Sequence, residues 1–328
     1  MKKLLKKTLK LILPVVLGGF ILFWVYRDFD FTKASDVLLH GTNWWWMFLS
    51  LLFGVFAQVF RGWRWRQTLE PLDAFPRRSD CVNAIFVSYA ASLVIPRIGE
   101  VSRCGILAKY DNVSFAKSLG TVVTERLVDT LTILLITVVT VLLQMPVFVT
   151  FLQQTGTKIP SLLHLLTSVW FYIVLFCFIG VLTLLYYLRK TLFFYEKVKG
   201  FVLNIWEGIM SLKSVRNIPL FIFYTLAIWA CYFFHFYFTF YSFAFTAHLG
   251  MMAALVMFVG GTFAVIVPTP NGAGPWHFAI ISMMMLYGVN ATDAGIFALI
   301  VHSIQTFLVV LLGVYGLAAL FLANRHRN

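Results

Sequence analysis

The chain has 328 residues, of which 60% are hydrophobic, 17% are aromatic and only 12% are charged. A soluble domain carries about 25% charged residues, so this composition excludes an ordinary water-soluble fold. The net charge of +13 would suit nucleic-acid binding, but the lysines and arginines stand between long apolar runs, as in the loops of membrane proteins. We therefore predict an all-α polytopic membrane protein that does not bind nucleic acid.

The apolar runs predict the membrane spans. The first run follows a lysine-rich start, as in a signal peptide, but Phe23, Trp24 and Tyr26 stand where a cleavage site would need small residues. An uncleaved first helix is therefore predicted. A helix of about 20 apolar residues crosses a bilayer. About six full spans are expected, at 8–28, 44–62, 115–143, 163–188, 218–247 and 293–322.

Two further apolar stretches are interrupted by proline and glycine. Residues 81–109 are interrupted at 95–100, and residues 249–289 are interrupted at 268–275. Because proline and glycine in such density end a helix, each stretch is predicted to be a broken, re-entrant helical hairpin that returns to the side from which it entered. Whether the hairpins cross the membrane stays open, since 249–267 is long enough to do so.

Lysine and arginine predict the orientation. With the N-terminus inside, Arg27, Lys33 and Lys158 are the only ones of the 26 that fall outside, and Arg126 lies within a span. Cytoplasmic loops carry such an excess of positive charge. We therefore expect both termini in the cytoplasm.

The order of these elements repeats along the chain. Residues 8–143 and 163–322 each contain span, span, re-entrant hairpin and span, and they start from opposite sides of the membrane. Paired interrupted helices in matching places are typical of transporters with an inverted repeat, whose substrate site lies between the repeats. We therefore predict a single transmembrane domain, 1–328, built from an inverted repeat. The alternative is a chance likeness of two Pro/Gly loops.

The first polar cluster lies at the first interruption and contains Arg97, Gly99, Glu100 and Arg103. Glu100 and Arg103 share a helix face because they are three residues apart. Gly99 would let the backbone approach a ligand, and the two arginines could hold a phosphate. The alternative is a set of residues at the membrane interface that pair with each other.

The second cluster, Glu125, Arg126 and Asp129, lies deep in the span 115–143. With Ser114 as the N-cap, these charges lie roughly 15–20 Å along the helix, where they must face protein or water rather than lipid. We expect them to join the first cluster in one network beside a substrate path. The alternative is a buried ion pair that fixes helix packing.

The third cluster, Asn271, Gly272, Gly274 and His277, follows the second interruption. Small residues here would let backbone amides line a cavity. His277 could titrate near neutral pH and give transport a pH dependence. A histidine that only packs in the membrane helix is the alternative.

Several catalytic patterns are absent from the sequence. There is no P-loop, no HExxH or GxSxG motif and no Cys/His spacing typical of a metal site. We therefore expect a protein that is not an enzyme and needs no cofactor or metal.

These clusters resemble the lysylphosphatidylglycerol synthase transmembrane-region family, also described as flippase-like. The resemblance covers nearly the whole chain. The motifs that carry the resemblance are Arg61-Gly62-x-Arg64, Pro96-Arg97-x-Gly99-Glu100-x-x-Arg103, Ser118, Glu125-Arg126-x-x-Asp129 and Pro270-Asn271-Gly272-Ala273-Gly274. The resemblance implies a protein of the bacterial inner membrane that moves phospholipids or modified lipids between leaflets.

The chain departs from this family in two respects. Some relatives carry a soluble aminoacyl-transfer domain, which this sequence lacks, so synthase activity is not expected. The family pattern at the second interruption is similar to Pro-Gly-Gly-Leu-Gly-x-x-Glu, whereas this chain has Asn271 and His277 at the first of those glycines and at the glutamate. We expect a stand-alone lipid flippase whose partner is its membrane lipid substrate. This role is also compatible with a homo-oligomer or with a protein partner from lipid synthesis. The alternative is a non-transporting membrane subunit or an enzyme of envelope-lipid synthesis.

Overall fold

The computed structural model describes residues 2–27, 29–95, 98–145 and 215–325. Within these ranges the chain is helical, and its one strand-like pairing is an isolated bridge between Thr42 and Phe243. Four helical segments in the described part are long and apolar enough to cross a membrane. The prediction of an all-α membrane protein is confirmed. The expected span 163–188 lies outside the described residues.

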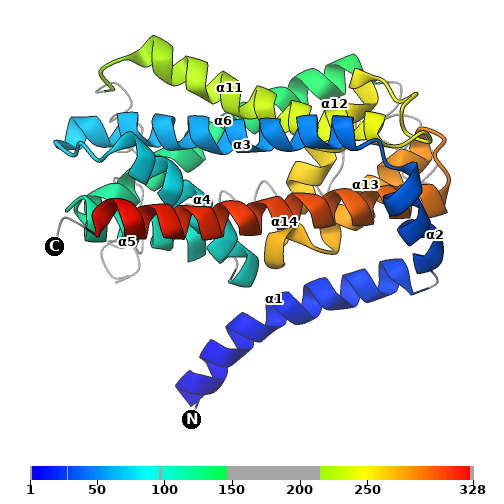
Figure 1. The fold of residues 1–328 in the computed structure, drawn as a ribbon, viewed down its shortest axis with the longest axis horizontal. Helices are drawn as coiled ribbons and strands as arrows, with labels where there is room; N and C mark the ends of the chain where they lie inside the picture. Colours follow the sequence, from blue (N-terminus) through cyan, green and yellow to red (C-terminus); the bar gives the residue numbers. More distant parts are fainter. Residues whose placement is uncertain (1, 28, 96–97, 146–214, 326–328) are drawn as a thin grey trace, which may run out of the picture.

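The four long segments form a bundle of roughly parallel and antiparallel helices (Figure 1). They are built on α3 (Trp44–Leu69), α6 (Phe115–Leu143), α11 (Ile218–Tyr237) and α14 (Ala291–Asn324). α6 has the predicted bounds. α11 ends ten residues before the predicted end at 247, because the chain tightens into a 3-10 turn, η4 (Phe238–Ser242). The Ser242 carbonyl oxygen there accepts a hydrogen bond from the Asn43 amide, 2.8 Å away.

The first helix lies beside the bundle rather than within it (Figure 1). α1 (Lys2–Tyr26) contacts the second hairpin, where Gly18 meets Thr269 and Ala273. A short helix, α2 (Phe31–Asp36), and a π-helical turn, η1 (Val37–Gly41), then lead into α3.

The two interrupted stretches are helical hairpins, as predicted. The first consists of α4 (Arg78–Val94) and α5 (Ile98–Tyr110), and the second of α12 (Met251–Ala264) and α13 (Pro275–Leu286). Each arm has fewer than the ~20 residues that a full span requires. The arm expected at 249–267 is only 14 residues long, because the helix ends at Ala264 and leads into the Pro/Gly segment.

The hairpins open at opposite ends of the bundle (Figure 1). α4 follows the end of α3 after a short connection containing the turn η2 (Glu70–Leu72), so the first hairpin opens at that end. α12 follows α11 at the other end, and α14 runs back from there. The inverted repeat predicts this arrangement of the hairpins.

Glycines bring the helices close together. A Cβ atom on Gly62 of α3 would lie 2.7 Å from the Val82 Cα of α4. On α14, a Cβ at Gly313 would lie 2.2 Å from the Cβ of Ala90. Small residues let membrane helices approach in this way. The first hairpin is thereby held between α3 and α14, while α12 of the second hairpin packs against α6 and α11.

Candidate functional site

Five charged side chains form a buried cluster within the bundle. Three are arginines and two are carboxylates, and the exposure of each residue is 6% or less. They are Arg61 and Arg64 of α3, Arg103 of α5, and Glu125 and Asp129 of α6. Isolated charges at this depth are costly, so the cluster is stable only because its members pair.

Asp129 is the centre of the cluster. Its carboxylate accepts hydrogen bonds from Arg61 Nη1 and Arg64 Nη2, each 2.7 Å away. Arg64 also donates to Thr225 Oγ1 on α11, 3.2 Å away, and its Nε lies 3.5 Å from Glu125 Oε1. Arg64 therefore ties α3 to both α6 and α11.

Arg103 joins the first hairpin to the same cluster. Its Nη1 donates to Glu125 Oε2 at 2.8 Å, and its guanidinium carbon lies 4.5 Å from the centre of the Trp65 ring. Arginine favours such a position because the guanidinium group can pair with a carboxylate and stack on an aromatic face at once. The Nη2 atom of Arg103 is buried without a hydrogen-bond partner in the described structure.

A second ion pair lies apart from the buried cluster. Arg126 Nε lies 2.7 Å from Glu100 Oε1, and these side chains are 49% and 34% exposed. The expected single network is therefore divided into two parts. Arg126 and Asp129 do not pair, because the helix turns their side chains toward different neighbours.

A cavity of about 760 Å³ lies between the tips of the two hairpins. Both hairpins line it, together with parts of α3, α6, α11 and α14. Arg61 and Arg103 reach it from the buried cluster, and Glu100 and Arg126 also line it. Two positive charges of the cluster thus face the cavity, while Glu125 and Asp129 are absent from its lining.

Other residues that line the cavity contribute hydrogen-bond donors that have no partner in the described structure. Trp229 Nε1 and Gln305 Nε2 line the cavity region and have no hydrogen-bond partner in the described structure. Buried polar groups without a partner are rare in proteins. The hydroxyls of Tyr89 and Tyr232 also line the cavity and pair with each other at 2.7 Å. The cavity therefore offers donors to a ligand rich in acceptor oxygens.

Helix packing requires a glycine at position 99, which the sequence did not show. A Cβ there would lie 2.0 Å from the Ser88 carbonyl oxygen, and the Gly99 amide donates to Ser92 Oγ at 3.2 Å. The glycine lets α5 approach α4, rather than serving a ligand alone, although it also lines the cavity. Ser114 precedes α6 as predicted, but its side chain makes no capping hydrogen bond.

Of the residues predicted at the tip of the second hairpin, some line the cavity and others do not. Asn271 and Gly272 line the cavity, and Asn271 Nδ2 donates to Thr306 Oγ1 at 2.7 Å. Gly274 (φ +93°) instead faces α1, since a Cβ there would lie 2.8 Å from the Cβ of Ile21.

His277 is buried and is not among the residues that line the cavity. Its Nδ1 accepts a hydrogen bond from the Gly274 amide at 3.3 Å. Its ring centre lies 4.5 Å from that of His302 and 5.7 Å from that of Tyr26. The histidine thus helps to start α13 and packs it against α1 and α14, while its expected role in substrate binding stays a prediction.

The structure adds Arg61 and Arg64 to the site, whereas in the sequence they stood out only as part of the motif that carries the family resemblance. α3 continues past the predicted end at 62, to Leu69, and both side chains point into the bundle. Their spacing of three residues on one helix face was the available signal. Arg97 lies outside the described residues.

No group of three His, Cys, Asp or Glu side chains in the described ranges could hold a metal ion. The free cysteines in that part, Cys81, Cys104 and Cys231, are buried and lie on α4, α5 and α11.

One of three comparisons with known proteins found a match. A family model described as "Lysylphosphatidylglycerol synthase TM region" matches residues 11–313. Searches of the curated proteins and of the solved structures found no match to the chain.

Proposed function

Because the chain belongs to the lysylphosphatidylglycerol synthase TM region family, whose members are membrane proteins with a lipid-related function, we propose that it is a lipid flippase. It moves a phospholipid or a modified lipid between the leaflets of a bacterial inner membrane. The chemistry is transport rather than catalysis. Both termini face the cytoplasm, as the distribution of lysine and arginine favours.

The observation that carries this proposal is the positive cavity between the hairpin tips. The buried cluster holds three arginines against two carboxylates, so it carries one excess positive charge. Arg61 and Arg103 present that charge to the cavity, whereas Arg126 and Glu100 balance each other. An anionic phosphate group suits this site because arginine pairs with phosphate oxygens through several N–H donors.

The size and lining of the cavity fit a lipid head group. A volume of about 760 Å³ falls within the roughly 300–1,000 Å³ of small-ligand sites, which is enough for a head group. Phe258, Val265 and Ile266 form part of an apolar wall near the second tip. Acyl chains can stay in the bilayer while the head group crosses through the cavity.

The hairpins supply a route from both leaflets. They open at opposite ends of the bundle, and their tips line the same cavity. In our proposal the two halves, 8–143 and 163–322, are an inverted repeat, and small movements of the hairpins expose the cavity to one side and then the other. Transporters of this kind place the substrate between the repeats.

A leaflet-exchange assay tests the proposal. The purified protein is reconstituted in vesicles with a fluorescent anionic phospholipid, and a membrane-impermeant reductant then quenches the outer leaflet. We expect the inner-leaflet fluorescence to decay faster than in protein-free vesicles. Thr130→Trp should block this decay because Thr130 lines the cavity.

Leu131→Trp is the matched control, since Leu131 is 59% exposed, neighbours Thr130 and does not line the cavity. Equal decay with and without protein would contradict transport and favour a non-transporting membrane subunit. Equal effects of the two tryptophans would contradict the assigned path.

A further inference from the structure

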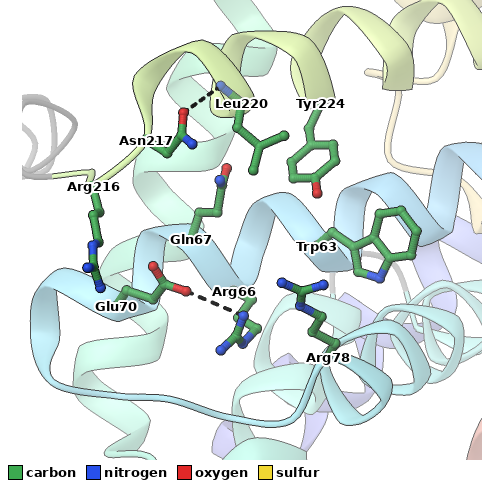
Figure 2. Close-up of a pocket in the computed structure, with 9 residues that line it drawn as sticks. All are labelled: Trp63, Arg66, Gln67, Glu70, Arg78, Arg216, Asn217, Leu220 and Tyr224. Atoms are coloured by element: carbon green, nitrogen blue, oxygen red, sulfur yellow. Dashed lines mark hydrogen bonds and ion pairs between the residues drawn. The ribbon is translucent and has the colours of Figure 1, made fainter.

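A second pocket lies at the end of the bundle where α3 ends and α4 and α11 begin (Figure 2). Its volume is about 270 Å³, and it shares no residue with the cavity between the hairpins. Three arginines and one glutamate line it together with polar and aromatic side chains. The lining residues that carry the argument are Arg66, Gln67, Glu70, Arg78, Arg216 and Trp63.

The charges of this pocket are unbalanced. Arg66 Nη1 lies 3.4 Å from Glu70 Oε1, and its Nε donates to the Pro76 carbonyl oxygen at 3.0 Å. Arg78 and Arg216 have no hydrogen-bond or ion-pair partner within the described ranges, and both are exposed. The lining therefore carries two excess positive charges.

Gln67 gives the pocket a buried polar group that lacks a partner. The residue is 9% exposed, and its Oε1 accepts no hydrogen bond in the described structure. Figure 2 shows its side chain between α3 and α11, directed toward α11. A buried amide of this kind costs free energy unless another group bonds to it. A ligand hydroxyl would supply the missing donor.

The start of α4 reaches the pocket through its first residue, Arg78. The first turn of α4 already carries the buried carboxylate of Asp80, so the positive charge of the pocket comes from its arginines. The Trp63 and Tyr224 rings, whose centres are 5.9 Å apart, border the pocket. Such aromatic rings favour the membrane–water interface.

We propose that this pocket binds a phosphate group that carries a hydroxylated substituent. Arg78, Arg216 and the free N–H groups of Arg66 pair with the phosphate oxygens, and Gln67 accepts from the hydroxyl. The phosphate belongs either to a lipid head group at the interface or to a soluble phosphate ester. The site is separate from the transport cavity and does not depend on transport.

Binding measurements with three probes test this site. The full-length protein, purified in a neutral detergent, is titrated with dioleoylphosphatidylglycerol, dioleoylphosphatidylcholine and glycerol 3-phosphate. We expect Arg78→Gln and Arg216→Gln each to raise the dissociation constant for the anionic probe by about tenfold. The loss of one hydrogen bond to a charged group weakens binding by about this factor. Phosphatidylcholine should bind weakly to every form of the protein.

Arg77→Gln is the matched control, because Arg77 is exposed, neighbours Arg78 and lies outside the pocket. It should leave binding unchanged. Selective loss with phosphatidylglycerol alone supports the site with a lipid as the source, and selective loss with glycerol 3-phosphate supports it with a soluble ester. Equal losses in Arg77→Gln and Arg78→Gln, or no loss in either pocket variant, would overturn the proposal. None of these results depends on leaflet exchange.

Discussion

Replacing Asp129 with Asn should destabilise the protein strongly. The carboxylate holds Arg61 and Arg64 at 2.7 Å each, and all three residues are 6% exposed or less. The substitution raises the net charge of the buried cluster from +1 to +2, removes the anionic partner of Arg61 and leaves Arg64 with Glu125 alone, 3.5 Å away. Removing one partner of a buried ion pair costs about 3–5 kcal/mol. Folded proteins are stable by only about 5–15 kcal/mol, so this loss is a large share.

The free energy of unfolding in mixed micelles checks this value. A denaturing detergent is added stepwise, and tryptophan fluorescence reports the unfolded fraction. Arg61→Gln combined with Asp129→Asn restores the net charge of +1 and should recover part of the lost stability. Asp36→Asn is the control, since Asp36 pairs at 2.9 Å with His40 and their side chains are 74% and 76% exposed. Such a pair contributes about 1 kcal/mol or less. Asp129→Asn that unfolds like the wild type, or a double variant no more stable than Asp129→Asn, would contradict a stabilising role of the Asp129 carboxylate.

Three further predictions follow from the geometry. Gly99→Ala should separate α5 from α4 and destabilise the fold, whereas Gly105→Ala on the same helix meets open space and should be tolerated, as thermal unfolding in detergent would show. Single cysteines at Ser114 and Thr292, which lie at the two hairpin openings, should react with a membrane-impermeant maleimide from opposite sides, and labelling from one side would contradict the proposed topology. His277→Gln should leave the curve of transport against pH unchanged, because His277 is not among the residues that line the cavity, and a flattened curve would instead support the role predicted from the sequence.

In the described residues, most of the helical architecture could be predicted from the sequence. Apolar length predicted α6 at its observed bounds, and the density of proline and glycine predicted both hairpins. These features are local, because a run of residues decides by itself whether a helix crosses the membrane or ends. The predicted span ended at 62, whereas α3 continues to Leu69, because Arg64 pairs inside the bundle.

The site could be predicted only in part. Glu125 and Asp129 were recognised as costly charges, but their partners on α3 were not, since a count of basic residues does not show which face of a helix they occupy. Gly99 was assigned to ligand approach, whereas its nearest neighbour is the α4 backbone. Such contacts depend on how helices far apart in sequence pack, and no local pattern contains that information.

In the proposed mechanism, the positive charge of the cavity binds the lipid head group while it crosses between the leaflets. Arg126 and Glu100 pair at 2.7 Å on its wall and are partly exposed, so each can be neutralised at little cost to the fold. Leaflet exchange of an anionic and a zwitterionic fluorescent phospholipid should be compared in Arg126→Gln, in Glu100→Gln and in Lys33→Gln, a control outside the cavity.

We expect Arg126→Gln to slow the exchange of the anionic lipid more than that of the zwitterionic one. Glu100→Gln should not slow the anionic lipid, and Lys33→Gln should change neither rate. Equal effects of Arg126→Gln and Glu100→Gln on both lipids would contradict a role of the cavity charge in transport.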